Sequence, residues 1–252
     1  MKYVLVLLLG FLFIWCSTPP QSQTFSGSSD MWSNILTWVH MLSTQSWSQK
    51  PYWDDISPDF LENSFLYDFE SDDSYQKFVN PEVSFQDISY IPEDLEKISG
   101  EFIIDSKWNQ TLRKETVENL HLLWEAFFQE FSQKLVVVSA YRSYSYQKWI
   151  KDRWCSDLYC AKAWHSEHQS GLAFDMFEAT NEQTFLSKSH LKKYFEWMNE
   201  NAHLYWFHNT YQKWREIDGY AVEPWHWRYV WIELATELKN QWKTFAEFVN
   251  QN

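Results

Sequence analysis

Glycine is scarce in this chain. Only five glycines occur in 252 residues, whereas average usage at this length would give about eighteen. Tryptophan deviates the other way, with seventeen residues. A glycine in a tight turn can take a positive φ angle and let backbones approach, and the largest side chain would obstruct such a position. The missing glycines and the excess tryptophans are nearly equal in number.

Cysteine and basic residues are also few. Of the three cysteines, Cys155 and Cys160 lie close together, which predicts a local disulfide if the protein is exported; a zinc thiolate pair usually needs two further ligands nearby. Residues 53–105 contain fifteen Asp and Glu against Lys77 and Lys97, which accounts for the whole net charge of -13. This balance argues against a nucleic-acid partner and indicates a solvated spacer.

Long apolar runs are scarce as well, and the longest opens the chain. Lys2 precedes the run from Val4 to Trp15, and Cys16 follows it. The run is too short for an ordinary membrane-spanning helix and is typical of a secretory signal, although a buried core helix would give a similar run. We expect residues 1–16 to be a signal peptide or lipoprotein signal, with Cys16 as the candidate lipidation site and membrane anchor.

The length favours a single catalytic domain. Residues 17–88, rich in Ser, Gln and Thr and then acidic, show no sustained period and are predicted to be a partly disordered tether. The domain is predicted over 89–252. Its patterns indicate strands near 135–138, 172–177 and 225–230, and helices near 112–131, 144–153, 190–202 and 232–249. This order predicts an α+β fold with a small, mainly antiparallel sheet flanked by helices.

Two segments carry the residues of a metal site. His168 and Asp175 are separated by a glycine turn, and Glu223 precedes His226 by three residues. Two imidazoles and a carboxylate, with a spare carboxylate as base, are the inventory of a catalytic zinc site. Glu223 and His226 can share such a site only if the chain bends between them, and Pro224 can supply the bend. The spacing alone leaves open a purely structural role for all four residues.

Three ordered motifs resemble those of VanY-like D-alanyl-D-alanine carboxypeptidases, zinc peptidases of the LAS type. They are Ser139-Ala140-Tyr141-Arg142-Ser143 with Gln147, then Ser166-x-His168-x-x-Gly171-x-Ala173-x-Asp175, then Glu223-x-Trp225-His226-x-Arg228. The resemblance covers about residues 90–235. It implies a LAS/hedgehog-like peptidase fold in which the zinc site lies at the sheet.

The same resemblance implies roles for individual residues. His168, Asp175 and His226 would bind Zn²⁺, and Glu223 would activate water. Arg142 would stabilise the oxyanion, although a structural salt bridge is the alternative. Gln147 and Ser166 would contact substrate, or else make local hydrogen bonds.

The implied partners are peptidoglycan stem peptides, cut by an exported, extracytoplasmic monomer that touches the membrane only through its N-terminus. Within the same family, the motifs also serve L,D-carboxypeptidases and peptidoglycan endopeptidases. A non-catalytic, zinc-stabilised cell-wall-binding module is the alternative from another class. Glu223 and Arg142 argue against it, because a structural zinc site needs neither a base nor an oxyanion donor.

Several tryptophans stand where the family usually has glycine, namely Trp164, Trp206, Trp214 and Trp231, and a glycine in place of Trp15 would improve the lipidation sequence. We hypothesise that these positions are glycines, encoded by UGA in an organism that reads this codon as glycine. The tryptophans would then come from translating the gene with a code in which UGA means tryptophan. Trp225, which the motif requires, would be genuine. The alternative is a tryptophan-rich protein with remodelled loops.

Overall fold

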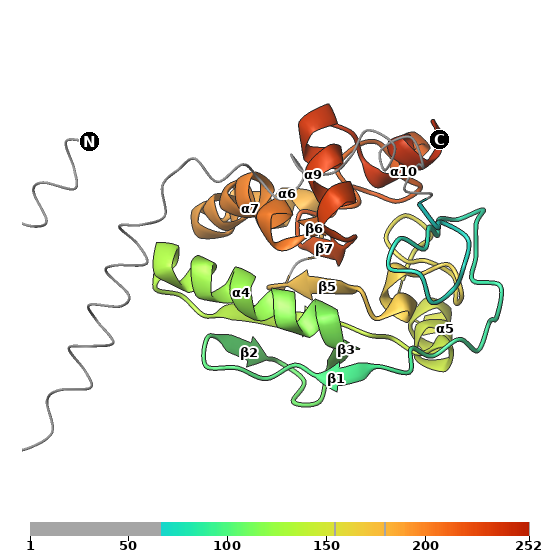
Figure 1. Cartoon of the computed structure of the whole chain (residues 1–252), viewed down its shortest axis with the longest axis horizontal. Helices are drawn as coiled ribbons and strands as arrows, with labels where there is room; N and C mark the ends of the chain where they lie inside the picture. The colour runs from blue at the N-terminus through green and yellow to red at the C-terminus, as the bar shows by residue number, and fades with distance from the viewer. Residues whose placement is uncertain (1–66, 154, 179, 252) are drawn as a thin grey trace, which may run out of the picture. The chain divides into compact units, whose positions relative to one another are not determined.

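The computed structural model describes residues 67–153, 155–178 and 180–251, and a five-stranded sheet forms their centre (Figure 1). The strands follow the order β2-β4-β5-β7-β6, with β2 (Ile103–Asp105) parallel to β4 (Leu135–Ser139) and the other pairs antiparallel. The remaining strands are β5 (Ala173–Met176), β6 (Phe207–His208) and β7 (His226–Tyr229). The predicted α+β fold with a mainly antiparallel sheet is confirmed.

The pairing of β5 with β7 brings two distant motifs together. Both strands are buried along their whole length, and Asp175 lies directly opposite His226 in the register. On the other side, β5 pairs with β4, the alternating apolar strand that ends at Ser139. Side chains from three motifs therefore meet at one end of neighbouring strands.

The helix α4 (Lys114–Phe131) covers one face of the sheet (Figure 1). Its apolar side chains recur at helical spacing and join the main core, as the sequence pattern predicts. The helix begins later than Leu112, because that residue lies in β3 (Thr111–Arg113), which pairs with β1 (Leu95–Lys97) in a separate two-stranded sheet.

The other helices surround the sheet. They are α5 (Tyr144–Arg153), α6 (Glu182–Ser187), α7 (Ser189–Asn201), α8 (Arg215–Asp218), α9 (Ile232–Gln241) and α10 (Phe245–Val249), with short 3-10 turns η2 (Glu167–Ser170) and η3 (Ala202–Tyr205). The predicted helix over 232–249 is thus two helices. Trp242 takes a left-handed conformation that ends α9, and Thr244 caps α10. Within the described part of the chain, no helix has the length and apolarity needed to cross a bilayer.

The folded unit already includes residues 67–88 and does not begin at residue 89. Phe78, Val79 and Phe85, which lie in the predicted tether, are 5%, 2% and 2% exposed, and Phe78 packs into a second core with residues of α9 and α10. The tether prediction is therefore wrong for residues 67–88. Their apolar residues follow no period because the segment folds as turns rather than as a helix or strand. Residues 1–66, including Cys16, lie outside the described residues.

Candidate active site

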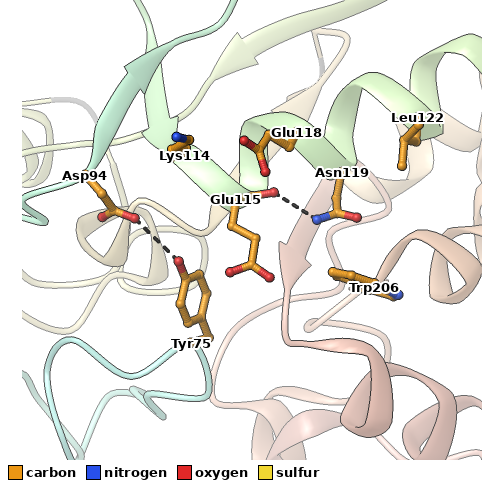
Figure 2. A pocket seen from close by; sticks show the side chains of 8 residues that line it. All are labelled: Tyr75, Asp94, Lys114, Glu115, Glu118, Asn119, Leu122 and Trp206. Carbon is orange, nitrogen blue, oxygen red and sulfur yellow. Dashed lines mark hydrogen bonds between the residues drawn. The ribbon is translucent and has the colours of Figure 1, made fainter.

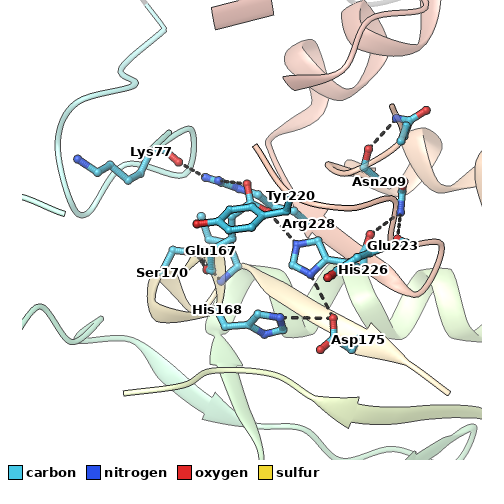
Figure 3. Close-up of polar contacts among 12 residues, drawn as sticks. Lys77, Glu167, His168, Ser170, Asp175, Asn209, Tyr220, Glu223, His226 and Arg228 are labelled. Carbon is cyan, nitrogen blue, oxygen red and sulfur yellow. Dashed lines mark hydrogen bonds and ion pairs between the residues drawn. The ribbon is translucent and has the colours of Figure 1, made fainter. Parts of the chain in front are cut away.

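His168, Asp175 and His226 converge into one buried cluster (Figure 3). One ligand atom from each lies within 4.8 Å of the others. Oδ1 of Asp175 is 3.4 Å from Nε2 of His168 and 3.1 Å from Nδ1 of His226. Gly171, at φ 70°, reverses the chain between η2 and β5 so that His168 faces Asp175. The structure thus brings together the three predicted ligands.

The outward nitrogen of each imidazole already has a hydrogen-bond acceptor. Nδ1 of His168 donates to the Ala140 carbonyl at 2.8 Å, and Nε2 of His226 donates to the Glu167 carboxylate at 2.8 Å. These bonds leave Nε2 of His168 and Nδ1 of His226 as the nitrogens that face Asp175. Two nitrogen lone pairs and one carboxylate oxygen at such separations fit Zn²⁺ in an open tetrahedral site.

The electrostatics of the cluster favour a cation at its centre. Burial and the nearby Arg142 charge lower the pKa of His168 to about 4, which keeps its imidazole neutral. Burial opposes charge on Asp175 too, but His168, His226 and Arg142 hold the pKa of its carboxyl well below the usual range. His226 would lose its proton through burial, yet the hydrogen bonds to Asp175 and Glu167 raise its pKa to about 9. A proton on Nδ1 of His226, which faces Asp175, therefore occupies the place that suits a metal cation.

Glu223 lies beside this cluster on the turn that precedes β7 (Figure 3). The chain turns at residues 224 and 225, and the side-chain amide of Asn209 donates to the carbonyls of Glu223 and His226. The predicted bend is confirmed. Burial raises the pKa of the Glu223 carboxyl to about 8, with attraction to His226 opposing and the Asp175 charge adding to the rise. A carboxyl with a pKa near neutrality suits a general base.

Arg142 reaches the cluster from the loop after β4. Its guanidinium donates to Ser139 Oγ at 2.9 Å, to Gln147 Oε1 at 2.9 Å and to Asp175 Oδ2 at 3.0 Å. Gln147 is fully buried, and its amide nitrogen donates to the Ala161 carbonyl at 2.8 Å. Gln147 therefore holds Arg142 in place through its side chain. Ser166 is also buried, at the start of η2.

Two residues of the motifs were not assigned a role from the sequence. Glu167 precedes His168, and its side chain is fully buried between His226 and Arg228 (Figure 3). Arg228 follows His226 by two residues and is fully buried as well. The available signal was a charged residue inside each of the two motifs, but the pairing of Glu167 with Arg228 across 61 positions is not visible in the sequence.

The comparisons with known proteins agree with this geometry. Residues 109–232 match the family model described as VanY, D-alanyl-D-alanine carboxypeptidase. YodJ of Bacillus subtilis (strain 168), assigned as a carboxypeptidase, is 32% identical over 209 residues, which cover 75% of each chain. The chain belongs to the VanY carboxypeptidase family.

Solved structures of family members share the fold. The LD-carboxypeptidase LdcB is 30% identical with a TM-score of 0.59, and the match covers 71% of this chain and 87% of LdcB. Two structures of the VanB-type VanY, one with D-alanine-D-alanine and one a mutant with Zn(II), are each 25% identical with TM-scores of 0.53. The two matches cover 69% and 68% of this chain and 96% and 97% of the respective VanY chains.

The cysteine pair of this VanY-family chain lies in the loop after α5. No disulfide joins the two sulfurs in the structure. The neighbouring Cys160 thiol, against an opposing effect of burial, lowers the pKa of Cys155 to about 7. The Gln147 amide nitrogen lies 3.9 Å from the Cys160 sulfur. The disulfide stays a prediction, and the pair lies directly behind the residue that holds Arg142.

A cavity of about 610 Å³ lies elsewhere, between the start of α4 and Trp206 (Figure 2). Tyr75, Asp94 and Glu115 line one end of it, and Tyr75 donates a 3.4 Å hydrogen bond to Asp94. None of the predicted site residues lines this cavity. This cavity is therefore separate from the His168, Asp175 and His226 cluster.

Proposed function

We propose that this chain is a zinc-dependent carboxypeptidase that removes the C-terminal D-alanine from peptidoglycan stem peptides. The observation that carries the proposal is the buried His168, Asp175 and His226 cluster with a carboxyl of raised pKa beside it. The family relationship and the Zn(II) in a VanY structure support the choice of metal.

The residues around the cluster divide the work of hydrolysis. Zinc, when bound by His168, Asp175 and His226, supplies Lewis acidity that polarises a carbonyl and lowers the pKa of water. Glu223 accepts the proton of the attacking water and returns it to the leaving amine. Arg142, fixed by Ser139 and Gln147, donates N–H groups to the oxyanion that develops on the scissile carbonyl.

A terminal L,D bond is the second candidate substrate. The match to LdcB, named an LD-carboxypeptidase, has the higher identity and TM-score of the structures compared above. Both reactions release D-alanine, from a pentapeptide that ends in D-Ala-D-Ala or from a tetrapeptide that ends in one D-Ala. The same catalytic residues would serve either bond.

The test is incubation of the zinc-loaded full chain with both peptides, with free D-alanine followed by mass spectrometry. We expect release from at least one peptide, loss of release with a chelator, and no release by Glu223→Ala. Release from the pentapeptide alone assigns D,D specificity, and release from the tetrapeptide alone assigns L,D specificity. Zinc binding without release from either would overturn the carboxypeptidase and favour a peptidoglycan endopeptidase or a wall-binding module.

We infer from this proposed substrate that the enzyme acts outside the cytoplasmic membrane. The N-terminal apolar run and Cys16 support export with an N-terminal anchor. Fractionation of the source cells should recover the chain with the membrane, and Cys16→Ala should release it if the anchor is a lipid on that cysteine.

A further inference from the structure

Glu167 is a fully buried carboxylate in direct contact with the candidate metal site. Its Oε2 accepts from Nε2 of His226 at 2.8 Å, and its Oε1 accepts from Arg228 at 2.7 Å (Figure 3). Its side chain is 0% exposed. A carboxylate without water is costly to bury unless each oxygen has a partner. Both oxygens have one, so this arrangement is a built feature of the site.

The two partners of Glu167 come from the same face of one strand. His226 and Arg228 are two residues apart on β7, so their side chains point to the same side of the sheet. This period explains why an arginine follows the histidine at that spacing in the third motif. The carboxylate of Glu167 lies across from both residues, on η2.

Arg228 is held from a further side. Its second terminal nitrogen donates to the carbonyls of Lys77 and Tyr75, in the segment before the predicted domain. The guanidinium also stacks over the ring of Phe245, 4.9 Å from its centroid. These contacts fix the Arg228 side chain, which in turn fixes the carboxylate that contacts His226.

The geometry points to Glu167 as a positioning residue that orients His226 for the metal, with Arg228 holding it in place. A hydrogen bond to Glu167 keeps the proton on Nε2 of His226 and leaves Nδ1 for the metal, and the negative charge makes the imidazole a stronger ligand. His168 is oriented instead by the neutral Ala140 carbonyl. This inference rests on the zinc site proposed above.

The test compares zinc affinity, measured by competition with a chromophoric chelator, among the wild type, Glu167→Gln and Glu115→Gln. Glu115 also accepts a hydrogen bond inside the fold, from the Tyr229 hydroxyl at 2.8 Å, but it does not contact the cluster. We expect Glu167→Gln to bind zinc about 10- to 100-fold more weakly, with the circular dichroism of the wild type, and Glu115→Gln to keep wild-type affinity.

A second readout covers the case in which Glu167→Gln does not fold. Nitrogen chemical shifts of the zinc-loaded wild type should show metal on Nδ1 of His226 and a proton on Nε2. Metal on Nε2, or a zinc affinity of folded Glu167→Gln within twofold of the wild type, would overturn the inference. A wild type that binds no zinc would instead refute the proposed function.

A separate observation concerns the tryptophans. Among the described non-glycine residues, seven have φ between 50° and 74°, and five of them are tryptophans. The five are Trp108, Trp164, Trp206, Trp231 and Trp242. This left-handed region favours glycine, and a bulky side chain there is an outlier. Three of the positions were identified from family motifs alone, and Trp108 and Trp242 are added by the backbone.

Other described tryptophans have no positive φ. Trp124 and Trp227 are about 1% exposed in a helix and a strand, and Trp225 is 9% exposed directly before His226 in the chain. Trp214, also at a family glycine position, has an ordinary φ of -74°. We infer that the five positive-φ positions are glycines in the natural protein, encoded by UGA, whereas Trp124, Trp225 and Trp227 are genuine.

The codons and the protein from its source cells test this inference together. We expect UGA at the five positions, UGG at Trp124, Trp225 and Trp227, and glycine in the masses of the peptides that span the five. UGG at the five positions, or tryptophan in those peptides, would overturn it. UGA at both sets would overturn it as well, because the codon would then not separate them.

Discussion

The guanidinium of Arg142 is held by three side chains, and only one of them belongs to the metal cluster. Ser139 and Gln147 fix its orientation, and Asp175 pairs with its far end. A planar fork can make these bonds and still present N–H groups to a substrate oxygen, whereas a lysine ammonium cannot reproduce the fork. The side chain therefore combines the two roles that the sequence left as alternatives, a structural ion pair and an oxyanion donor.

Arg142→Lys should therefore reduce kcat/KM for D-alanine release by about 100-fold or more, since loss of one oxyanion donor has costs of that order. Zinc content should stay unchanged. Steady-state kinetics with the peptide that the enzyme accepts provide the measurement. The matched control is Lys148→Arg on α5, which alters an exposed pair with Asp152 and should keep wild-type kinetics. Full activity in Arg142→Lys would remove Arg142 from the mechanism.

Trp108 offers a direct test of backbone strain in the chain that has tryptophan at this position. Its φ is 71° and its side chain is 83% exposed, so a glycine there relieves strain and loses little packing. Trp108→Gly should raise the free energy of unfolding by about 1 kcal/mol, because the left-handed cost exceeds the added entropy of the unfolded chain. Trp214→Gly, with 75% exposure and an ordinary φ of -74°, should lower it. Urea denaturation measures the change in the free energy of unfolding for both variants. Changes of the same sign in the two variants would contradict the strain argument.

At the scale of elements, β6 buries a histidine that resists protonation. Burial lowers the pKa of His208 from 6.5 to about 4. Its Nε2 accepts from the Gln212 amide at 3.2 Å, and a protonated ring would face that donor with another donor. Unfolding exposes His208, which then takes up a proton below pH 6.5. Its contribution to stability is therefore present above pH 6.5 and is lost as the pH falls toward 4.

The loss from His208 should be about 2 kcal/mol between pH 7 and pH 5. Urea unfolding with a chelator present, at both pH values, compares the wild type with His208→Gln, which cannot be protonated. The variant should lose less stability between pH 7 and pH 5 by about that amount. His168 contributes equally to both proteins and cancels in the comparison. An identical loss in the two proteins would show that His208 is protonated in the folded state.

The longer elements could be predicted from the sequence because their patterns are local. The bounds of α5 agree with the prediction, and α4, β4, β5, α7 and β7 agree within a few residues. The short strands β1, β2, β3 and β6 were missed because two or three residues show no period. The break between α9 and α10 was missed because it depends on Trp242 in a conformation that tryptophan rarely takes.

The candidate site was predictable where residues lie within one motif. His168, Asp175, Glu223 and His226 were identified from residue types and spacing, and the register of β5 with β7 places two of them opposite each other. The outer contacts were not predictable. Glu167 meets Arg228 across 61 positions, and Arg228 meets Lys77 across 151. Such pairs depend on tertiary packing rather than on any local pattern.

At the scale of the whole molecule, residues 67–88 are part of the folded unit and contact residues next to the candidate metal cluster. His165 has the Asn80 carbonyl 2.7 Å from its Nδ1, and the Lys77 carbonyl accepts from Arg228. Lys77 is itself buried and pairs with Asp72 at 3.0 Å. The acidic segment thus supplies main-chain acceptors to cationic and polar side chains next to the metal cluster.

A chain that begins at residue 89 should therefore lose stability, although it retains all the family motifs. Removing Phe78, Val79 and Phe85 exposes their core neighbours, at roughly 1.5–3 kcal/mol for each buried side chain. Arg228 and His165 would also lose acceptors, at about 1–3 kcal/mol each. The sum is comparable to the whole stability of a typical domain.

Thermal unfolding and zinc binding should be measured for the full chain and for chains that begin at residues 66 and 89. The chain from residue 66 should match the full chain, and the one from residue 89 should unfold at a much lower temperature or aggregate. Removal of residues 67–88 takes away the carbonyl acceptors of buried Arg228, so a loss of stability is expected. Equal melting temperatures for all three chains would contradict this prediction and would mean that residues 67–88 contribute nothing to the fold.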